Sequence, residues 1–293
     1  PIYANDQFSK LHIYRFVDGQ FTKLDDTMAT LSAGDIDVRD SQPLRISGRV
    51  SKHNHLHFNN GFLYAVTTEN KDHRLETLAI MGNSVISLNH LSLGSGYADV
   101  AVSFTQNNAY ISEASYHYGG GLSWSDMQAI SLEDPSSPQL AQEIRIATSL
   151  DQLMFSGDAL IGLGKARSNM SGQYRSLGSV SRFDATGTQT NHILLGADYQ
   201  YVSVPYQYDD QSVYLDASAQ RLFIPYAVSH PLFTGLESAL PPYQSRLTIA
   251  NFANSQVEEE HTFTLPALPE RSISVTDTQA FTFSNEYIHS LTN

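Results

Sequence analysis

The sequence predicts an all-β fold, and within that class a β-propeller built from four-stranded antiparallel blades. Three observations in the 293-residue chain predict it. Short runs that alternate apolar and polar residues are separated by turns rich in Gly, Asn, Asp and Pro. Hairpins recur at intervals of roughly 50 to 65 residues. No convincing apolar stripe of helical periodicity reaches about ten residues.

Four strands of one kind recur in order along the chain. Each mixes small, aliphatic or aromatic residues and starts at or next to a turn residue, as strands of a small sheet do. They are residues 61–66, 108–113, 158–164 and 220–226. Each is followed, after a connection of variable length, by a hairpin.

Five hairpins can be placed from their turn residues. Gly and Asn accept positive φ in tight turns, and Asp-Pro fixes the start of a turn. The expected strand pairs are 12–16 with 21–24, 77–80 with 85–88, 127–132 with 140–146, 179–183 with 189–194, and 247–252 with 257–263.

The repeat favours a propeller over a sandwich of two large sheets. A four-stranded blade needs roughly 40 to 50 residues, and insertions explain the longer intervals. We expect the insertions at residues 115–125, 167–177 and 229–243. A sandwich gives no reason for such a repeat.

The predicted number of blades depends on whether the N-terminal and C-terminal residues form one shared blade. Four internal blades and a first blade shared between residues 1–30 and 268–293 predict five blades in a single domain, residues 1–293. Pairing the two ends closes the ring without an open strand edge. The alternative is that this chain is part of a ring of six to eight blades.

Several strand and turn motifs resemble one known family. They are Leu-Ile-Gly-Leu-Gly-Lys at 160–165, Ile-Ser-Leu-Glu-Asp-Pro-Ser-Ser-Pro at 130–138, the strand 220–225, and the segments 270–277 and 281–284. The sequence resembles uncharacterised exported β-propeller proteins of bacteria and archaea. The resemblance implies a propeller in the periplasm, in the medium or anchored at the cell surface, and it implies no particular chemistry.

Composition and charge exclude several classes of function. The chain has 17 basic and 30 acidic residues and a net charge of −13, which disfavours nucleic-acid binding. It has no Cys, hence no disulfide and no thiolate nucleophile or metal ligand. No apolar run approaches the roughly 20 residues of a transmembrane helix. The nucleophile-elbow, H-E-x-x-H and G-x-G-x-x-G patterns of common enzymes are also missing.

One short segment has the spacing of a metal site. His53, His55 and His57 alternate along the chain, so in a strand they would share one face. Neighbouring imidazoles in such a row could bind one Zn, Ni or Cu ion, with a further ligand from elsewhere. The alternative is a polar strand face whose histidines bind water.

Two aromatic stretches predict a partner-binding surface. Tyr is stiff and amphipathic and is enriched in binding surfaces, and Trp can stack on a sugar, fill a partner's pocket or cap its own blade. The candidates are Tyr116, Tyr118 and Trp124 in a Gly-rich stretch, and Tyr206 and Tyr208 in the stretch 198–216, which also contains Tyr199. Carboxylates in 198–216 could bind Ca²⁺, but no EF-hand pattern is present.

The sequence supports three functional hypotheses. The first is a non-catalytic, exported binding or scaffold module for a protein or polysaccharide partner at the cell envelope. The second is a metal-dependent hydrolase or lyase that acts on extracellular polymer through the histidine row. The third is a structural surface protein stabilised by Ca²⁺.

Overall fold

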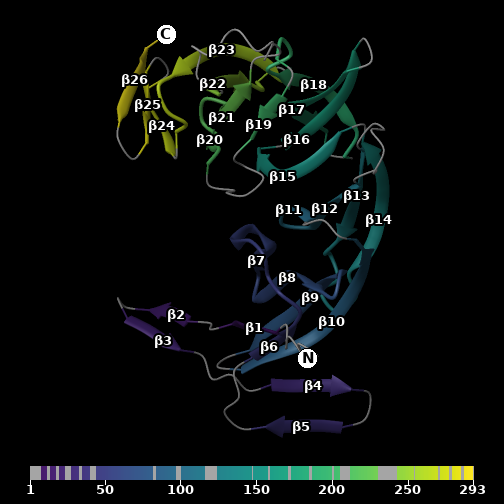
Figure 1. Ribbon diagram of the computed structural model, residues 1–293. Coiled ribbons are helices and arrows are strands. Elements are labelled where there is room, and N and C mark those ends of the chain that lie inside the picture. Colours follow the sequence, from purple (N-terminus) through teal and green to yellow (C-terminus); the bar gives the residue numbers. More distant parts are fainter. Residues whose placement is uncertain are drawn as a thin grey trace, which may run out of the picture. The chain divides into compact units, whose positions relative to one another are not determined.

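The computed structural model describes the chain from Phe8 to Thr292 in stretches separated by gaps. The described residues are 8–11, 14–17, 20–23, 28–32, 35–39, 44–81, 84–96, 100–115, 124–146, 148–157, 159–170, 173–184, 187–199, 201–204, 212–229, 243–253, 255–269, 271–276, 279–284 and 287–292. Within these ranges the structure consists of strands and one turn of 3-10 helix, η1 (His53–His55) (Figure 1). No helix in them is long and apolar enough to cross a membrane.

The strands repeat as the four-stranded blades of a β-propeller. Four consecutive sets of four strands form sheets: β7 to β10, β11 to β14, β15 to β18, and β20 to β23. In the first, third and fourth sets each strand pairs antiparallel with the next strand in sequence. This meander is the blade architecture that the sequence predicts.

The chain divides into two compact units, of which the first comprises Pro1–Ile111 and Gln128–Gln142. Its complete blade consists of β7 (Leu56–Asn59), β8 (Phe62–Glu69), β9 (Asp72–Met81) and β10 (Ser84–Ser95). At the β10 edge, β4 (Met28–Ser32) pairs in parallel, and β5 (Asp35–Arg39) pairs with β4. Two further pairs are β1 (Phe8–Leu11) with β6 (Leu44–Ser47), and β2 (Tyr14–Val17) with β3 (Gln20–Lys23).

The central strands β8 and β9 of the first blade are buried on both faces, which explains their continuous apolar runs. One face packs in a cluster that includes Tyr64, Val66 and Leu75, and the other includes Ala65 and Leu78. The next blade, which contributes residues to both units, consists of β11 (Val100–Phe104), β12 (Asn108–Ser115), β13 (Trp124–Ser131) and β14 (Gln139–Ile146).

The second unit, Ser112–Met127 and Glu143–Asn293, contains a nine-stranded sheet that joins two blades. The short strand β19 (Tyr201–Ser203) connects them, because it pairs in parallel with β17 and antiparallel with β21. The third blade is β15 (Ser149–Ser156), β16 (Ala159–Met170), β17 (Gln173–Phe183) and β18 (Gln189–Leu195). The fourth is β20 (Tyr214–Asp216), β21 (Arg221–Ser229), β22 (Gln244–Asn251) and β23 (Glu258–Leu265).

The last strands of the second unit form a three-stranded sheet. It consists of β24 (Arg271–Thr276), β25 (Gln279–Phe283) and β26 (Ile288–Thr292). Leu291 of β26 belongs to the same apolar cluster as Phe223 and Leu247 of the fourth blade. Four complete blades and this sheet agree with the predicted count of five. That residues 1–30 and 268–293 share one blade of a single closed domain stays a prediction.

The structure confirms all five predicted hairpins and shows how one predicted insertion is folded. The hairpins are β2–β3, β9–β10, β13–β14, β17–β18 and β22–β23. The residues of the insertion predicted at 167–177 extend β16 and β17 into a long hairpin, in which Arg167 pairs with Ser176.

Candidate functional site

The structure places the three histidines predicted to bind a metal in different local settings. His53 and His55 belong to η1, and His57 lies in β7. The prediction that they form one row on a strand is therefore wrong. The cause is local, because the His55 N–H donates to the Lys52 carbonyl at 3.2 Å and winds this segment into a turn.

The contacts of these histidines differ as well. His55 is buried, and its Nε2 lies 3.2 Å from the Val100 carbonyl oxygen. His57 stacks on Phe104 with ring centroids 5.0 Å apart and planes 6° apart, and burial lowers the pKa of His57. Among the described residues, no group of three or more His, Asp or Glu side chains could hold a metal ion. The imidazoles of His55 and His57 thus belong to the packing of the first unit.

Most of the predicted partner-binding residues lie outside the described residues. These are Tyr116, Tyr118, Tyr206 and Tyr208. Trp124 is the first residue of β13, and its side chain is not described. Their roles stay predictions. The structure does place the strand ends between which their connections run.

In the second unit, hydrogen bonds join the start of β13 to β15 and join β19 to β17 and β21. At the start of β13 the Ser125 hydroxyl accepts a hydrogen bond of 2.9 Å from the Leu150 N–H, at the start of β15. Farther along the same sheet Ser176 pairs with Tyr201, and Tyr201 pairs with Ser229 at the end of β21.

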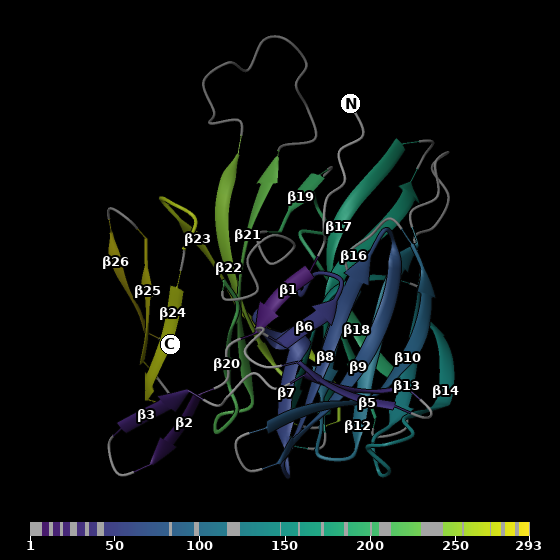
Figure 2. The same ribbon diagram turned by 90° about the horizontal axis from the view of Figure 1, so that it is seen from below.

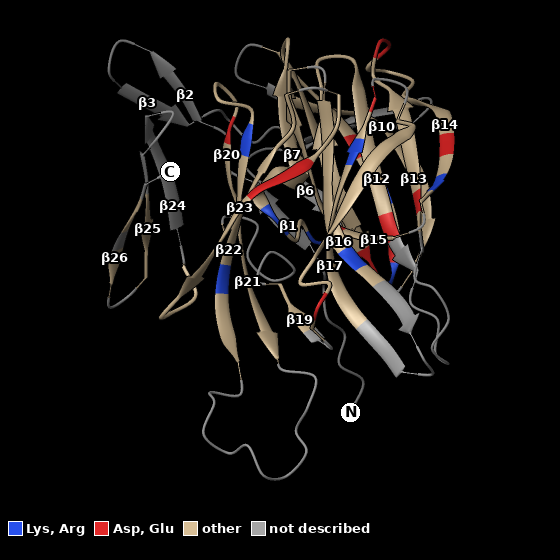
Figure 3. Ribbon diagram, turned by 90° about the horizontal axis from the view of Figure 1, so that it is seen from above, with Lys and Arg blue, Asp and Glu red and all other residues tan. Residues whose placement is uncertain are grey.

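Strands β16 and β17 link these two places. Ser149 pairs with Lys165, and Lys165 pairs with Gly178, two residues from Ser176. We name this edge the loop-bearing end: the end of the second unit at which β13 and β15 begin, β19 lies and β21 ends. Figures 2 and 3 show β16, β17, β19, β21 and β22 reaching the same side of that unit. The sequence insertions at 115–125 and 229–243 leave from this end.

A cluster of Tyr199, Gln244 and Arg246 lies at the loop-bearing end, and we name it the arginine cluster. Gln244 and Arg246 are the first and third residues of β22 and share a strand face. The Arg246 guanidinium carbon lies 4.6 Å from the Tyr199 ring centroid, and Nη2 donates a hydrogen bond to the Tyr199 hydroxyl. Nε and Nη2 also donate to Oε1 of Gln244, at 3.3 and 3.1 Å.

The partners that hold Arg246 are neutral. A cation over an aromatic ring is attracted by the ring's electron density, but the ring carries no net charge. The Tyr199 hydroxyl also donates to Gln244 Oε1 at 3.4 Å, which completes a triangle of contacts. The cluster therefore orients the guanidinium of a half-buried arginine without neutralising it.

Gly196 allows Tyr199 to reach Arg246. The Tyr199 N–H donates to the Gly196 carbonyl at 3.0 Å, which closes a tight turn after β18. Gly196 has φ +68°, and a Cβ there would lie 2.7 Å from Cγ2 of Val202 and 3.2 Å from Cγ1 of Val228. Only glycine combines this backbone conformation with so close a contact.

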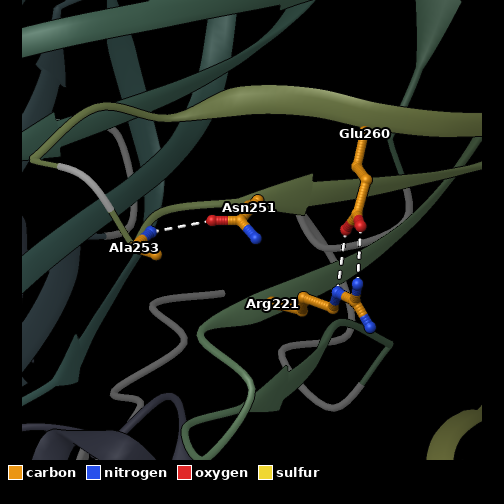
Figure 4. Close-up of polar contacts among 4 residues, drawn as sticks. All are labelled: Arg221, Asn251, Ala253 and Glu260. Atoms are coloured by element: carbon orange, nitrogen blue, oxygen red, sulfur yellow. Dashed lines mark hydrogen bonds and ion pairs between the residues drawn. The ribbon is translucent and has the colours of Figure 1, made fainter. Parts of the chain in front are cut away.

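Arg221, the first residue of β21, is instead held by a charged partner. Its Nε and Nη2 donate to the two carboxylate oxygens of Glu260, at 2.8 and 2.5 Å, across the intervening strand β22 (Figure 4). In the same figure the Ala253 N–H donates to Asn251 Oδ1 at 2.8 Å, which stabilises the β22–β23 turn. Arg221 is thus a neutralised, structural arginine.

Sequence reasoning missed two members of the arginine cluster. Tyr199 lies in the predicted aromatic stretch, but Gln244 and Arg246 were not singled out. Their contact with Tyr199 depends on strand β19, whose parallel pairing with β17 has no turn signal in the sequence. The available signal was a Gln-x-Arg pattern directly after the insertion at 229–243.

Comparisons with known proteins give distant structural similarity only. No family model matches the sequence, and no curated protein matches it. Solved structures that resemble it include the hydrazine synthase of Kuenenia stuttgartiensis, with 11% identity over 76% of this chain and 58% of that chain, at a TM-score of 0.46. An apocarotenoid oxygenase mutant of Synechocystis shows 9% identity over 95% and 65%, at a TM-score of 0.42.

A third similar structure is the GH32 β-fructofuranosidase BmSUC1 of Bombyx mori, with 8% identity over 78% of this chain and 53% of that chain, at a TM-score of 0.37. This chain spans less than two thirds of each of these three chains. At such TM-scores the likeness carries no inference about activity. The resemblance to exported propeller proteins likewise stays a prediction.

Proposed function

We propose that this chain is a non-catalytic, exported binding module that receives a protein or glycan partner at the loop-bearing end of its second unit. The observation that carries the proposal is the arginine cluster. A charged side chain held in a fixed orientation by neutral partners keeps its electrostatic potential for a ligand.

The surrounding architecture supports the proposal. Loops on a rigid sheet scaffold are where binding residues concentrate, and two sequence insertions with aromatic residues leave from this end. The opposite turns of the same sheet are short and carry the neutralised Arg221–Glu260 pair. In this nine-stranded sheet, Arg246 and the Arg221–Glu260 pair therefore lie toward opposite ends of the strands.

The alternative of a metal-dependent hydrolase has less support. It depended on a row of three histidines, and two of these have separate packing partners in the first unit. Location at the cell envelope remains part of the proposal through the sequence resemblance. Fractionation of source cells with an antibody against this chain tests the location, and a purely cytosolic signal would contradict it.

A binding screen tests the proposed function. The purified chain is applied to immobilised envelope polysaccharides and envelope proteins, beside a variant in which residues 230–242 are replaced by a short Gly-Ser turn. We expect binding to at least one partner that the variant loses while its circular dichroism and melting temperature are retained. Equal binding by both chains would place the site elsewhere.

A further inference from the structure

The arginine cluster also indicates what kind of chemical group the partner presents. We propose that Arg246 binds a carboxylate on a sugar residue of a glycan whose other residues are neutral. This inference rests on the proposed function, because it names the ligand class of the same site.

The contacts of Arg246 use only part of its guanidinium. Arginine has five N–H donors in a planar fork suited to carboxylates. The contacts to Tyr199 and Gln244 use Nε and Nη2. Within the described ranges, Nη1 and its two N–H groups make no hydrogen bond, so these donors are left for a ligand.

Three other arginines of the chain pair with protein carboxylates. Arg74 lies 3.3 Å from a Glu69 carboxylate oxygen, and Arg145 lies 3.0 Å from an Asp126 oxygen. Arg221 pairs with Glu260. Acidic residues outnumber basic residues by 30 to 17 in this chain. Among the residues that the structure describes, Arg246 is held instead by a phenol and an amide, so a ligand can supply a carboxylate.

The net charge of the chain restricts the rest of the ligand. A net charge of −13 repels a polyanion at long range, so a densely charged polymer is a poor partner. A single carboxylate among neutral groups avoids this repulsion and still gains charge-assisted hydrogen bonds to Arg246. At this end Tyr199 lies under the Arg246 guanidinium, and Tyr243, directly before β22, is 57% exposed. Flat aromatic side chains with polar neighbours suit a sugar, which has apolar ring faces and many hydroxyls.

Isothermal titration with a matched pair of ligands tests the inference. The ligands are an oligosaccharide of neutral sugars that carries one glucuronic acid residue, and the methyl ester of the same compound. We expect the acid to bind roughly 10- to 100-fold more tightly, because the ester loses the charge-assisted hydrogen bonds. A third probe, a short peptide with a free carboxyl terminus, tests the other source of a carboxylate.

Three variants assign the preference to a residue. Arg246→Met should bind acid and ester equally, and Arg246→Lys should keep part of the preference, since it retains the charge without the fork. Arg145→Met is the matched control, because its side chain is 72% exposed and pairs with Asp126, and it should behave as the wild type. Melting temperatures check that each variant is folded.

Each outcome decides between the two proposals. Equal affinity of the wild type for acid and ester would overturn the carboxylate inference while leaving the proposed function intact. A preference that survives in Arg246→Met would move the site away from the arginine cluster. Binding of the peptide without the oligosaccharide would overturn the glycan class. If the wild type bound neither these ligands nor any partner in the screen, the proposed function itself would fail.

Discussion

At the residue scale, the partners of each arginine determine whether its positive charge is neutralised within the protein. Arg246 is fixed by a ring and an amide, whereas Arg221 is neutralised by Glu260. The difference depends on Gly196, whose backbone conformation turns the chain so that Tyr199 can cover Arg246.

Replacing Gly196 by Ala should therefore destabilise the protein and loosen the arginine cluster. The added Cβ would approach Val202 to 2.7 Å at a residue with φ +68°. We expect a loss of about 2 kcal/mol or more in the free energy of unfolding, measured by urea denaturation. Gly157→Ala is the control: φ is +60°, but nothing lies within 4 Å, so its loss should be only about 1 kcal/mol. Equal losses would show that the contact is unimportant.

Burial of Glu76 predicts a specific pH dependence of stability. Glu76 is buried on β9, and burial raises its pKa, although His90 and Arg74 oppose the shift and Glu69 adds to it. A raised pKa means that the folded state binds the proton more tightly than the unfolded state. Its contribution is then most favourable below the ordinary value of 4.5 and declines as pH rises through the folded-state pKa. Glu76→Gln should flatten this decline and be more stable at pH 7, as thermal melts across pH would show. A less stable Gln variant at pH 7 would contradict this.

Arg182 gives a third prediction at this scale. Arg182 is 7% exposed, and on β17 it pairs with Ile161 of β16 and Asn191 of β18. Within the described part of the chain its Nε makes no hydrogen bond. Burying such a donor costs free energy, and methionine has a similar length without it. We expect Arg182→Met to raise the free energy of unfolding by about 1 kcal/mol in urea denaturation. A clear loss of stability would indicate that Arg182 has a partner in solution.

At the element scale, the sequence predicted the elements whose signals lie in adjacent residues. Each hairpin has its turn residues inside the hairpin, so all five could be placed from the sequence. The turn η1 and the bridging strand β19 could not. A three-residue strand that pairs in parallel across two blades has no local pattern, and the alternating histidines matched a strand although a backbone hydrogen bond winds them into a turn.

The Arg221–Glu260 pair should be a measurable link between β21 and β23. The two side chains are 16% and 25% exposed and make two hydrogen bonds. A double-mutant cycle with Arg221→Met and Glu260→Gln should give a coupling of about 1 to 2 kcal/mol. The same cycle on Arg145 and Asp126, where the arginine is 72% exposed, should give less than about 0.5 kcal/mol. Equal couplings would show that burial of the first pair adds nothing.

At the scale of the whole molecule, the sequence repeat predicted the fold but did not predict the arginine cluster. Blades of similar length could be predicted because each contains its own turns and apolar runs. The arginine cluster could not, since Tyr199 and Arg246 meet only through the pairing of β17, β19, β21 and β22. The repeat thus predicts a scaffold, and the connections between strands determine what it binds.

Hydrogen–deuterium exchange, with and without the partner found in the screen, tests whether the loop-bearing end is the binding site. We predict that the partner slows exchange in peptides that contain Tyr199 to Ser203 and residues 229–246, at the loop-bearing end of the second unit. Strands β7 to β10 of the first unit should exchange as before. Protection confined to the first unit, or no partner that protects any segment, would contradict the claim that this end of the sheet is the binding site.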